Sequence, residues 1–247
     1  MVIAALFAGG SGTRLGAAAP KQFLPLGGEP ILVRCLRAFA CGGPVELCLV
    51  CVPAAYVAYC ETLLAEALPE TACPVRVIAG GATRSGTLLS ALLYLEKEGL
   101  LRDAVLLTHD AVRPFVTRKM IEDNVAAARA YGACNTCVPA TDTVFLSADG
   151  RFLDTVPARS TVFHAQTPQT FLAEELLELC RRIPPAQFDA LTDGCSVYTY
   201  FQRPVAMVPG DRDNIKITYP EDLDRAEEIL RRRSETKTEK EGAVCRS

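Results

Sequence analysis

The sequence predicts an α/β fold with a Rossmann-like, doubly wound and mostly parallel sheet. Short continuous apolar runs, such as residues 2–8 and 45–52, are typical of strands buried on both faces. Between them lie longer segments whose apolar residues recur every three or four positions, which indicates helices that cover the sheet. Because ligands of such sheets bind beyond the carboxyl ends of the strands, we expect a site in the loops after residues 8, 79 and 108.

The expected elements alternate regularly. Apolar and β-branched runs predict strands at 2–8, 45–52, 74–78, 104–108, 133–139 and 204–208. Helical spacing predicts helices at 31–40, 54–67, 83–98, 117–131, 173–181 and 220–233. Thr117 is a suitable N-cap for its helix, and the last helix has acidic residues early and arginines late, which favours the helix dipole.

Residues 141–166 interrupt this alternation. Two short apolar runs flank Asp149-Gly150, which predicts a β-hairpin with a tight turn. A hairpin that leaves a compact body is either a dimerisation arm or an edge hairpin folded on its own body, and the pattern leaves both open. We expect one domain over residues 1–233 with an arm at about 140–166, followed by a flexible polar tail at 234–247.

Composition excludes several classes of protein. The 247 residues carry 26 Lys and Arg against 29 Asp and Glu, a net charge of −3, which argues against broad nucleic-acid binding. No apolar run approaches the roughly 20 residues of a membrane span, and no secretory leader is apparent. The eleven cysteines lie mostly in apolar segments, so we expect small buried side chains in a reducing, cytoplasmic setting.

Two Cys-x-x-Cys spacings, at Cys48/Cys51 and Cys134/Cys137, are compatible with a zinc site. Cys48 and Cys51 lie in a predicted strand, where residues three apart point to opposite faces. We therefore favour buried strand cysteines over a metal site.

The glycine-rich loop after the first strand is the first candidate for chemistry. Ala8, Gly9 and Gly10 allow the backbone to approach a phosphate, and Arg14 and Lys21 add positive charge close by. The spacing fits neither the Walker A motif nor the dinucleotide-binding motif GxGxxG. The alternative is a tight strand–helix turn, but the two cations favour a phosphate site.

A second loop of this kind follows the third strand. Gly80 and Gly81 precede Arg84, and the hydroxyls of Thr83 and Thr87 lie at the same helix start. Thr83 can also cap this helix, which is the alternative role for the segment.

Asp110 and Arg113 stand just beyond the strand at 104–108. A carboxylate there suits Mg²⁺, which prefers oxygen and often takes one carboxylate together with substrate phosphates. Arg113 is close enough to pair with Asp110 or with a phosphate, and the alternative is a structural ion pair in a turn.

His109 is a candidate base without a Ser or Cys nucleophile beside it. His164 is the only other histidine in the sequence, which excludes a multi-histidine metal site.

Lys216 lies between two isoleucines after the last predicted strand. A strand-like segment would hold it rigidly near the edge of the sheet. The alternative is an ordinary surface lysine whose stem lies along apolar surface.

Taken together, these segments resemble the CTP-dependent cytidylyltransferases that act on 2-C-methyl-D-erythritol 4-phosphate or D-ribitol 5-phosphate. The resemblance covers about residues 2–230. It rests on these motifs in order: Ala8-Gly9-Gly10-Ser11-Gly12-Thr13-Arg14-Leu15-Gly16, Pro20-Lys21-Gln22-Phe23, Gly80-Gly81 with Arg84, His109-Asp110-Ala111-Val112-Arg113-Pro114, Asp142-Thr143, Gln166-Thr167-Pro168-Gln169, Leu191-Thr192-Asp193 and Asn214-Ile215-Lys216-Ile217-Thr218.

The resemblance implies a reaction in which an acceptor phosphate attacks the α-phosphorus of CTP in line and Mg²⁺-pyrophosphate leaves, giving a CDP-alditol. The work of such a catalyst is charge neutralisation and positioning, without a covalent intermediate. It implies catalytic roles for Arg14, Lys21 and Lys216 at the reacting phosphates. The implied nucleotide-binding residues are Ala8, Gly9, Gly10, Gly80, Gly81, Arg84 and Thr87.

The resemblance also implies an acceptor site, a metal site and a partner. The implied acceptor-binding residues are Asp110, Arg113, Thr143, Arg159, Thr167 and Thr192. Asp110 is the implied Mg²⁺ ligand, with Asp213 as a second candidate. Because Thr143 and Arg159 lie on the arm, they would reach into a second copy of the chain and make the enzyme a homodimer with shared sites, with no nucleic-acid or membrane partner.

Departures from the family pattern bear on the acceptor. Many methylerythritol-phosphate enzymes have Pro-Ala-Ala-Gly where this chain has Phe7-Ala8-Gly9-Gly10, Ser in place of Thr87, and a basic residue in place of Thr141. Residues 108–115 and 156–159 look closer to the ribitol-phosphate branch. We therefore expect D-ribitol 5-phosphate, with 2-C-methyl-D-erythritol 4-phosphate as the alternative, so the pathway (teichoic-acid type polymer or isoprenoid precursor) stays open.

Three other classes fit parts of the sequence. A nucleotidyltransferase for another sugar phosphate or base would share the glycine-rich start followed by Pro-Lys. A non-catalytic nucleotide-binding module would lack the phosphate-binding charges that are present here. An NAD(P) dehydrogenase would need a third glycine that the first loop does not place at the right offset.

Overall fold

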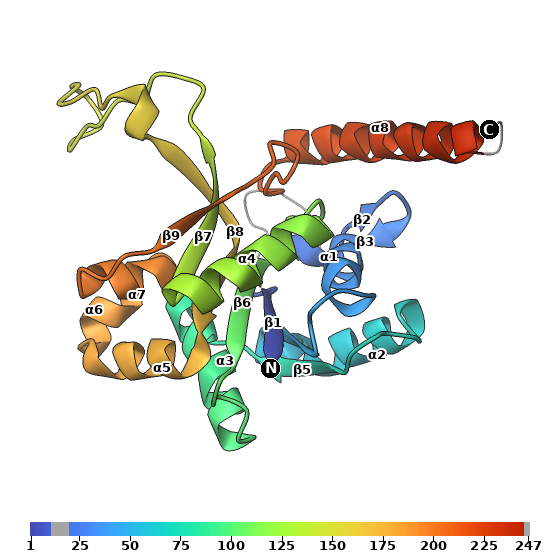
Figure 1. Cartoon of the computed structure of the whole chain (residues 1–247), viewed down its shortest axis with the longest axis horizontal. Coiled ribbons are helices and arrows are strands. Elements are labelled where there is room, and N and C mark those ends of the chain that lie inside the picture. Colours follow the sequence, from blue (N-terminus) through green and yellow to red (C-terminus); the bar gives the residue numbers. More distant parts are fainter. Residues whose placement is uncertain (11–19, 245–247) are drawn as a thin grey trace.

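The computed structural model describes residues 1–10 and 20–244, with side chains described as far as residue 235 (Figure 1). Within these residues, seven strands form one sheet in the order β5-β4-β1-β6-β8-β7-β9, and β2 (Pro25–Leu26) pairs separately with β3 (Glu29–Pro30). The strands of the large sheet are β1 (Val2–Phe7), β4 (Leu47–Val52), β5 (Val75–Ala79), β6 (Val105–Asp110), β7 (Ala133–Pro139), β8 (Phe163–Leu172) and β9 (Ala206–Pro209).

The predicted α/β class is confirmed, with one strand that the sequence did not reveal. β1, β4, β5 and β6 pair in parallel, as do β7 and β9, whereas β8 runs antiparallel to both β6 and β7. A search for apolar runs does not find β8, because its buried centre includes four polar residues: Gln166, Thr167, Gln169 and Thr170. Such side chains can be buried because they find partners inside; Thr170, for example, donates from Oγ1 to Asn124 Oδ1 at 3.2 Å.

Helices cover both faces of the sheet. One apolar core joins the sheet to α1 (Ile31–Ala40), α2 (Val57–Ala67), α4 (Arg118–Tyr131) and α8 (Pro220–Val244). The other joins it to α3 (Arg84–Lys97), α5 (Ala173–Arg182), α6 (Pro185–Asp189) and α7 (Gly194–Tyr200). Short 3₁₀ segments lie at η2 (Lys21–Phe23), η3 (Ala54–Tyr56) and η4 (Arg159–Thr161).

The side chains of the central strands alternate between these two cores. In β1, Ala4 and Leu6 face the first core while Ile3 and Ala5 face the second. Cys48 and Cys51 of β4 divide in the same way, so the predicted opposite orientation of this pair is confirmed. Two thiols on opposite faces of a sheet cannot bind one metal ion together.

The helix boundaries lie close to the predicted ones, and their caps explain why. Thr83 accepts a hydrogen bond from the backbone N–H of Gly86 at 2.9 Å, and Thr117 accepts one from Met120 at 3.2 Å. The main difference is α8, which continues to Val244 and so includes much of the segment expected to be a flexible tail. No helix in the described part of the chain is both long and apolar enough to cross a membrane.

The segment between β7 and β8 forms an arm, residues 140–162, that projects from the body (Figure 1). The predicted turn is present: the carboxylate of Asp149 accepts hydrogen bonds from the backbone N–H groups of Arg151 at 2.8 Å and Phe152 at 3.0 Å. A single bridge, between Leu146 and Thr155, closes it, so the predicted two-stranded hairpin is only partly formed. Extensive pairing is not favoured because the apolar residues of the arm bury no common face within this chain.

Candidate active site

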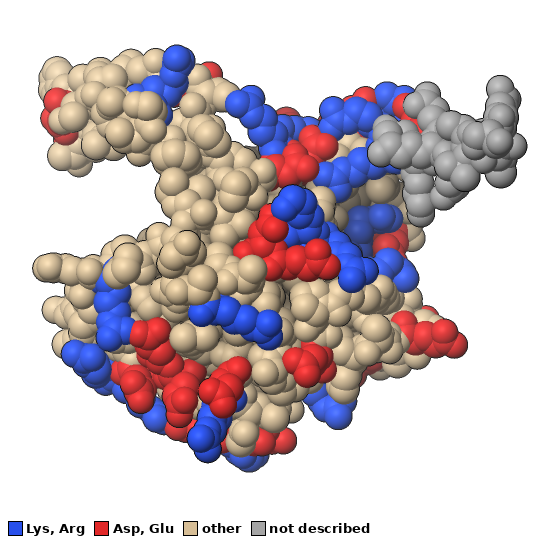
Figure 2. Space-filling model, viewed as in Figure 1, with Lys and Arg blue, Asp and Glu red and all other residues tan. Residues whose placement is uncertain are grey.

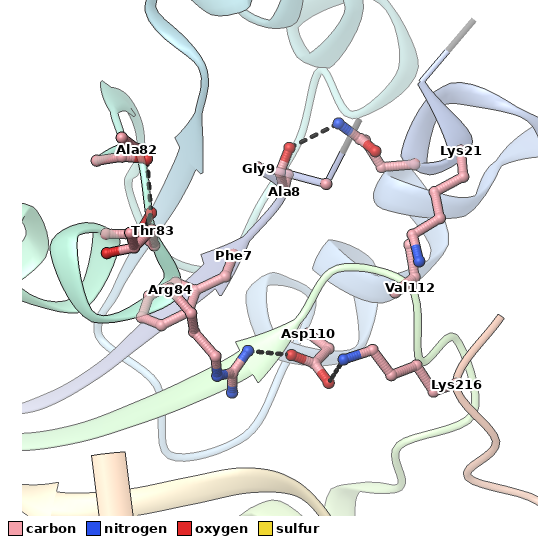
Figure 3. A pocket seen from close by; sticks show the side chains of 14 residues that line it. Phe7, Ala8, Gly9, Lys21, Ala82, Thr83, Arg84, Asp110, Val112 and Lys216 are labelled. Carbon is pink, nitrogen blue, oxygen red and sulfur yellow. Dashed lines mark hydrogen bonds and ion pairs between the residues drawn. The ribbon is translucent and has the colours of Figure 1, made fainter. Parts of the chain in front are cut away.

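A cleft of about 260 Å³ opens at the carboxyl ends of β1, β5 and β6 (Figure 3). These are the loops in which the sequence predicted a ligand site. The cleft is lined by Phe7, Ala8, Gly9, Gly10, Lys21, Gln22, Gly81, Ala82, Thr83, Arg84, Thr87, Asp110, Val112 and Lys216.

Lys21 is held at one side of the cleft by the short η2 segment. Its Nζ donates a hydrogen bond to the carbonyl of Ile217 at 3.1 Å. The neighbouring Gln22 donates from Nε2 to the carbonyl of Ala8 at 2.6 Å, which ties η2 to the end of β1. We did not assign a role to Gln22 from the sequence, although its place directly after Lys21 was the available signal. Arg14 lies outside the described residues.

The second glycine loop is compact because it packs against the start of α3. A Cβ at Gly81 would overlap the backbone of Gly86, so this position requires glycine. Thr87 donates from its hydroxyl to the carbonyl of Thr83 at 2.9 Å and lies against Gly80. Gly80 is not among the residues that line the cleft, and its N–H donates a hydrogen bond to the carbonyl of Val52 in β4 at 2.7 Å.

Asp110 lies among three cations at the end of β6. Lys216 Nζ lies 3.1 Å from Oδ2, Arg113 Nε lies 3.3 Å from the same oxygen, and Arg84 forms an ion pair with Oδ1. Burial alone would raise the pKa of this carboxyl, but the charges of Arg84, Lys216 and Arg113 outweigh it and hold the pKa well below its usual range. The carboxylate therefore stays ionised at neutral pH, and the four side chains together carry a net positive charge.

Arg84 has a second support that the sequence did not reveal. Gln169, on β8, accepts a hydrogen bond on Oε1 from the backbone N–H of Gly194 at 3.3 Å, and Arg84 Nη2 lies 3.5 Å from the same oxygen. The guanidinium also lies over the ring of Phe7, 5.4 Å from its centroid. The amide and the ring fix the direction in which Arg84 enters the cleft.

Lys216 reaches the cleft from an irregular segment, so the predicted strand-like segment is wrong. The backbone N–H of Ile217 donates to the carbonyl of Val112 at 2.9 Å, and the side chain of Ile217 is buried. On the other side, Arg113 donates from Nη1 to the carbonyl of Asn214 at 2.8 Å. These long-range bonds hold the segment against the loop after β6, and Lys216, whose side chain is 41% exposed, pairs from it with the buried Asp110.

His109 points into the protein interior and not into the cleft. Its Nε2 lies 3.1 Å from the carbonyl of Arg113, and its Nδ1 lies 2.9 Å from the hydroxyl of Thr167. Burial lowers the pKa of His109 to about 4, so the imidazole is neutral at physiological pH. It supports the loop that follows Asp110, and the structure does not favour the role of base considered from the sequence.

The buried imidazole predicts a loss of stability in mild acid. The pKa of His109 is about 4 in the folded protein against 6.5 ordinarily, so the unfolded chain binds a proton first as the pH falls. The resulting contribution is present above pH 6.5 and declines between pH 6.5 and about 4, by roughly 3 kcal/mol at most. Urea unfolding at several pH values should show this decline in the wild type and a shallower one in His109→Gln. Equal slopes in the two proteins would contradict this assignment.

Of the predicted acceptor-binding residues, only Asp110 and Arg113 belong to the charge cluster at the cleft. Thr167 is buried, and its hydroxyl accepts a hydrogen bond from the backbone N–H of Asp110 at 3.2 Å. Thr192 is exposed in the turn before α7, while Thr143 and Arg159 are exposed on the arm. None of these four lines the cleft of its own chain, so their roles stay predictions.

The structure places the two predicted metal ligands apart. Asp213 does not line the cleft; it pairs with Arg232 at 2.6 Å and with Arg233 at 3.7 Å. No group of three or more His, Cys, Asp or Glu side chains lies together in the described part of the chain. Asp110 is the one carboxylate among the described residues that line the cleft. A single carboxylate fits Mg²⁺ that takes its remaining ligands from substrate phosphates and water.

Comparison with known proteins points to one family. The model of the IspD family, described as 2-C-methyl-D-erythritol 4-phosphate cytidylyltransferase, matches residues 2–232. The ribitol-5-phosphate cytidylyltransferase of Lactiplantibacillus plantarum is 36% identical over 236 residues, which are 95% of this chain and 100% of that protein.

Solved structures of similar proteins share the fold. The 2-C-methyl-D-erythritol 4-phosphate cytidylyltransferase of Thermus thermophilus is 28% identical with a TM-score of 0.68, over 94% of this chain and 100% of that one. A 4-diphosphocytidyl-2C-methyl-D-erythritol synthase is 26% identical with a TM-score of 0.74, over 93% and 98%. The family match covers nearly the whole chain, so this protein belongs to the IspD family of cytidylyltransferases.

Proposed function

We propose that the protein is a cytoplasmic enzyme that transfers CMP from CTP to D-ribitol 5-phosphate, forming CDP-ribitol and pyrophosphate. The observation that carries the proposal is the cleft itself, where two glycine loops, Lys21, Arg84 and Lys216 surround a space next to an ionised carboxylate. Bare backbone and fixed cations of this kind suit a triphosphate.

The proposed reaction needs positioning and charge neutralisation from this chain. An oxygen of the acceptor phosphate forms a bond to the α-phosphorus of CTP, and the bond from that phosphorus to the β-phosphate bridging oxygen breaks, so pyrophosphate leaves with the electron pair. Lys21 and Lys216 enter the cleft from separate segments and supply positive charge to the phosphates. Charge placed in advance in a partly enclosed site stabilises the transition state without reorganisation.

Mg²⁺ would add charge neutralisation on the triphosphate, and Asp110 is the residue that would hold it. Asp110 already orients Arg84, Arg113 and Lys216. Phosphate oxygens entering the cleft would share these cations with the carboxylate. The backbone of the Gly81 loop and the hydroxyl of Thr87 also line the cleft and remain for the nucleoside end of CTP. Ala82 and Thr83 of this loop lie on the opposite side of the cleft from Lys21 (Figure 3).

The choice of acceptor follows the more similar relative. The relative from Lactiplantibacillus plantarum, which is named for ribitol 5-phosphate, is 36% identical, whereas the two solved methylerythritol-phosphate enzymes are 26% and 28% identical. The family description favours 2-C-methyl-D-erythritol 4-phosphate as the second candidate. The two acceptors differ by a methyl branch and chain length, a difference that a pocket discriminates by only about 1–3 kcal/mol.

Turnover with each acceptor tests the proposal. Purified protein with CTP and Mg²⁺ should release pyrophosphate with D-ribitol 5-phosphate, and its kcat/KM should exceed that with 2-C-methyl-D-erythritol 4-phosphate by at least about tenfold. UTP, GTP and dTTP serve as controls for the nucleotide. A higher kcat/KM with the methylerythritol phosphate would favour the second candidate, and no turnover with either would overturn the proposal.

We further propose that the arm joins two copies of the chain and carries Thr143 and Arg159 to the partner's cleft. The arm exposes Phe145 to 61% and Phe152 to 74%, and its visible face is largely uncharged (Figure 2). Exposed apolar surface of this kind favours association. Sedimentation should give a dimer for the wild type and a monomer for Phe145→Asp/Phe152→Asp, with Tyr131→Asp, exposed on α4, as the control. A monomeric wild type would contradict this part of the proposal.

A further inference from the structure

A second cleft, of about 330 Å³, opens at the base of the arm. We call it the basal cleft; it lies between the outer ends of β7 and β8, the loop after β9 and the first turns of α8. Three arginines, Arg113, Arg212 and Arg225, and one histidine, His164, line it. None of the described residues that line it is Asp or Glu, so its wall is positively charged.

Neither Arg212 nor Arg225 forms an ion pair with an Asp or Glu side chain in the part of the chain that the structure describes. No carboxylate there neutralises their charge. The contrast is with Arg233, farther along α8, which lies 3.5 Å from Asp211 and 3.7 Å from Asp213. The two acidic residues beside Arg212 in the sequence thus pair with arginines of α8, and Arg212 lines the basal cleft together with Arg225.

Arg113 lines the basal cleft and pairs with Asp110 of the first cleft, which we call the nucleotide cleft. Its Nε faces Asp110 at 3.3 Å, its Nη1 donates to the carbonyl of Asn214 at 2.8 Å, and its Nη2 lies 3.5 Å from the carbonyl of Ala165. Only 11% of its side chain is exposed. The basal cleft is therefore backed by a guanidinium that is fixed in position before any ligand binds.

From these charges we propose that the basal cleft is a second phosphate-binding site, separate from the nucleotide cleft. Guanidinium groups present paired N–H donors that match the oxygens of a phosphate, and the exposed Arg212 and Arg225 line a cleft of about 330 Å³ with room for a small phosphorylated molecule. The ligand class is an inorganic or organic phosphate carrying one or two phosphate groups. The inference goes beyond the proposed transfer reaction and does not depend on it, because it concerns binding and not turnover.

Equilibrium dialysis of the full chain with radiolabelled inorganic phosphate tests this site. Measured in the Lys216→Ala background, which weakens phosphate binding in the nucleotide cleft, the double variant Arg212→Ala/Arg225→Ala should weaken the remaining phosphate binding at least about tenfold. Both side chains are exposed, so the fold should tolerate the change, and in a chain that keeps Lys216 the kcat with CTP and acceptor should stay near the wild-type value. The matched control Arg118→Ala/Arg129→Ala removes the same charge from exposed positions on α4 and should leave binding unchanged.

A further variant distinguishes phosphate binding in the basal cleft from phosphate binding in the nucleotide cleft. Different phosphate compounds as probes then show which kind of phosphate the basal cleft binds. Lys216→Ala weakens the nucleotide cleft and should leave the phosphate site at the basal cleft intact. Repeating the titration with pyrophosphate and with D-ribitol 5-phosphate shows which phosphate the site prefers. Undiminished phosphate binding in Arg212→Ala/Arg225→Ala in the Lys216→Ala background, or equal loss in the α4 control, would overturn the inference, whatever the outcome of the turnover assay.

Discussion

Replacement of Lys216 by alanine is expected to lower kcat for CMP transfer by a factor of about 10²–10³ while the protein remains folded. Lys216 enters the nucleotide cleft 3.1 Å from Asp110, and 41% of its side chain is exposed, so its loss removes charge from the reacting phosphates without opening the core. Because the charge matters most in the transition state, kcat should fall more than the KM for CTP rises. Steady-state kinetics with CTP and the preferred acceptor measure both quantities.

The matched control for this prediction is Lys119→Ala. Lys119 lies on α4, its side chain is 80% exposed and pairs with Asp123, and neither residue lines the cleft. Its removal changes the net charge equally and should leave kcat unchanged. Lys21→Ala should resemble Lys216→Ala, since both side chains line the same cleft. A kcat within threefold or so of wild type for Lys216→Ala would remove its role at the phosphates.

Replacement of Asp110 by alanine is expected to cost about 3–5 kcal/mol in the free energy of unfolding, in addition to activity. The carboxylate is 7% exposed and faces Arg84, Arg113 and Lys216, so its removal leaves Arg113 buried without its ionic partner. The pKa of Asp110 is lowered in the folded protein, so its contribution is present above the ordinary value of 3.8 and is lost as the pH falls further. Urea unfolding at pH 7 measures the difference directly.

Two comparisons make this prediction specific. Asp123→Ala breaks an exposed pair with Lys119 and should cost no more than about 0.5 kcal/mol. Asp110→Asn keeps the shape but not the charge and should lie between the wild type and Asp110→Ala. Stability of Asp110→Ala equal to that of Asp123→Ala would show that the three cations do not depend on this carboxylate.

The parts of the fold that the sequence predicted are those governed by apolar patterning and caps. β1 and β4 are continuous apolar runs, and β6 begins with one, because these strands are covered on both faces. Thr83 and Thr117 cap helices as expected. β8 was missed because hydrogen bonds between distant segments, which no local pattern displays, stabilise its buried polar centre. The same limit applies to Gln169, whose contact with Arg84 joins residues 85 positions apart.

The candidate site shows the same division. Parallel strands bring the loops after β1, β5 and β6 together, so their meeting follows from topology alone. The separation of Asp213 from Asp110 could not be predicted, because it depends on ion pairs between Asp213 and the arginines of α8. The role of His109 likewise depended on the direction of a side chain, which burial and the hydroxyl of Thr167 decide.

A crystal structure of the protein with CTP and Mg²⁺ tests the central claim most directly. The triphosphate is expected to lie between Lys21 and Lys216, with the cytosine toward the Gly81 loop and the metal ion on Asp110. A nucleotide bound away from this cleft, or bound with its base against Lys216 and its phosphates outside, would contradict it.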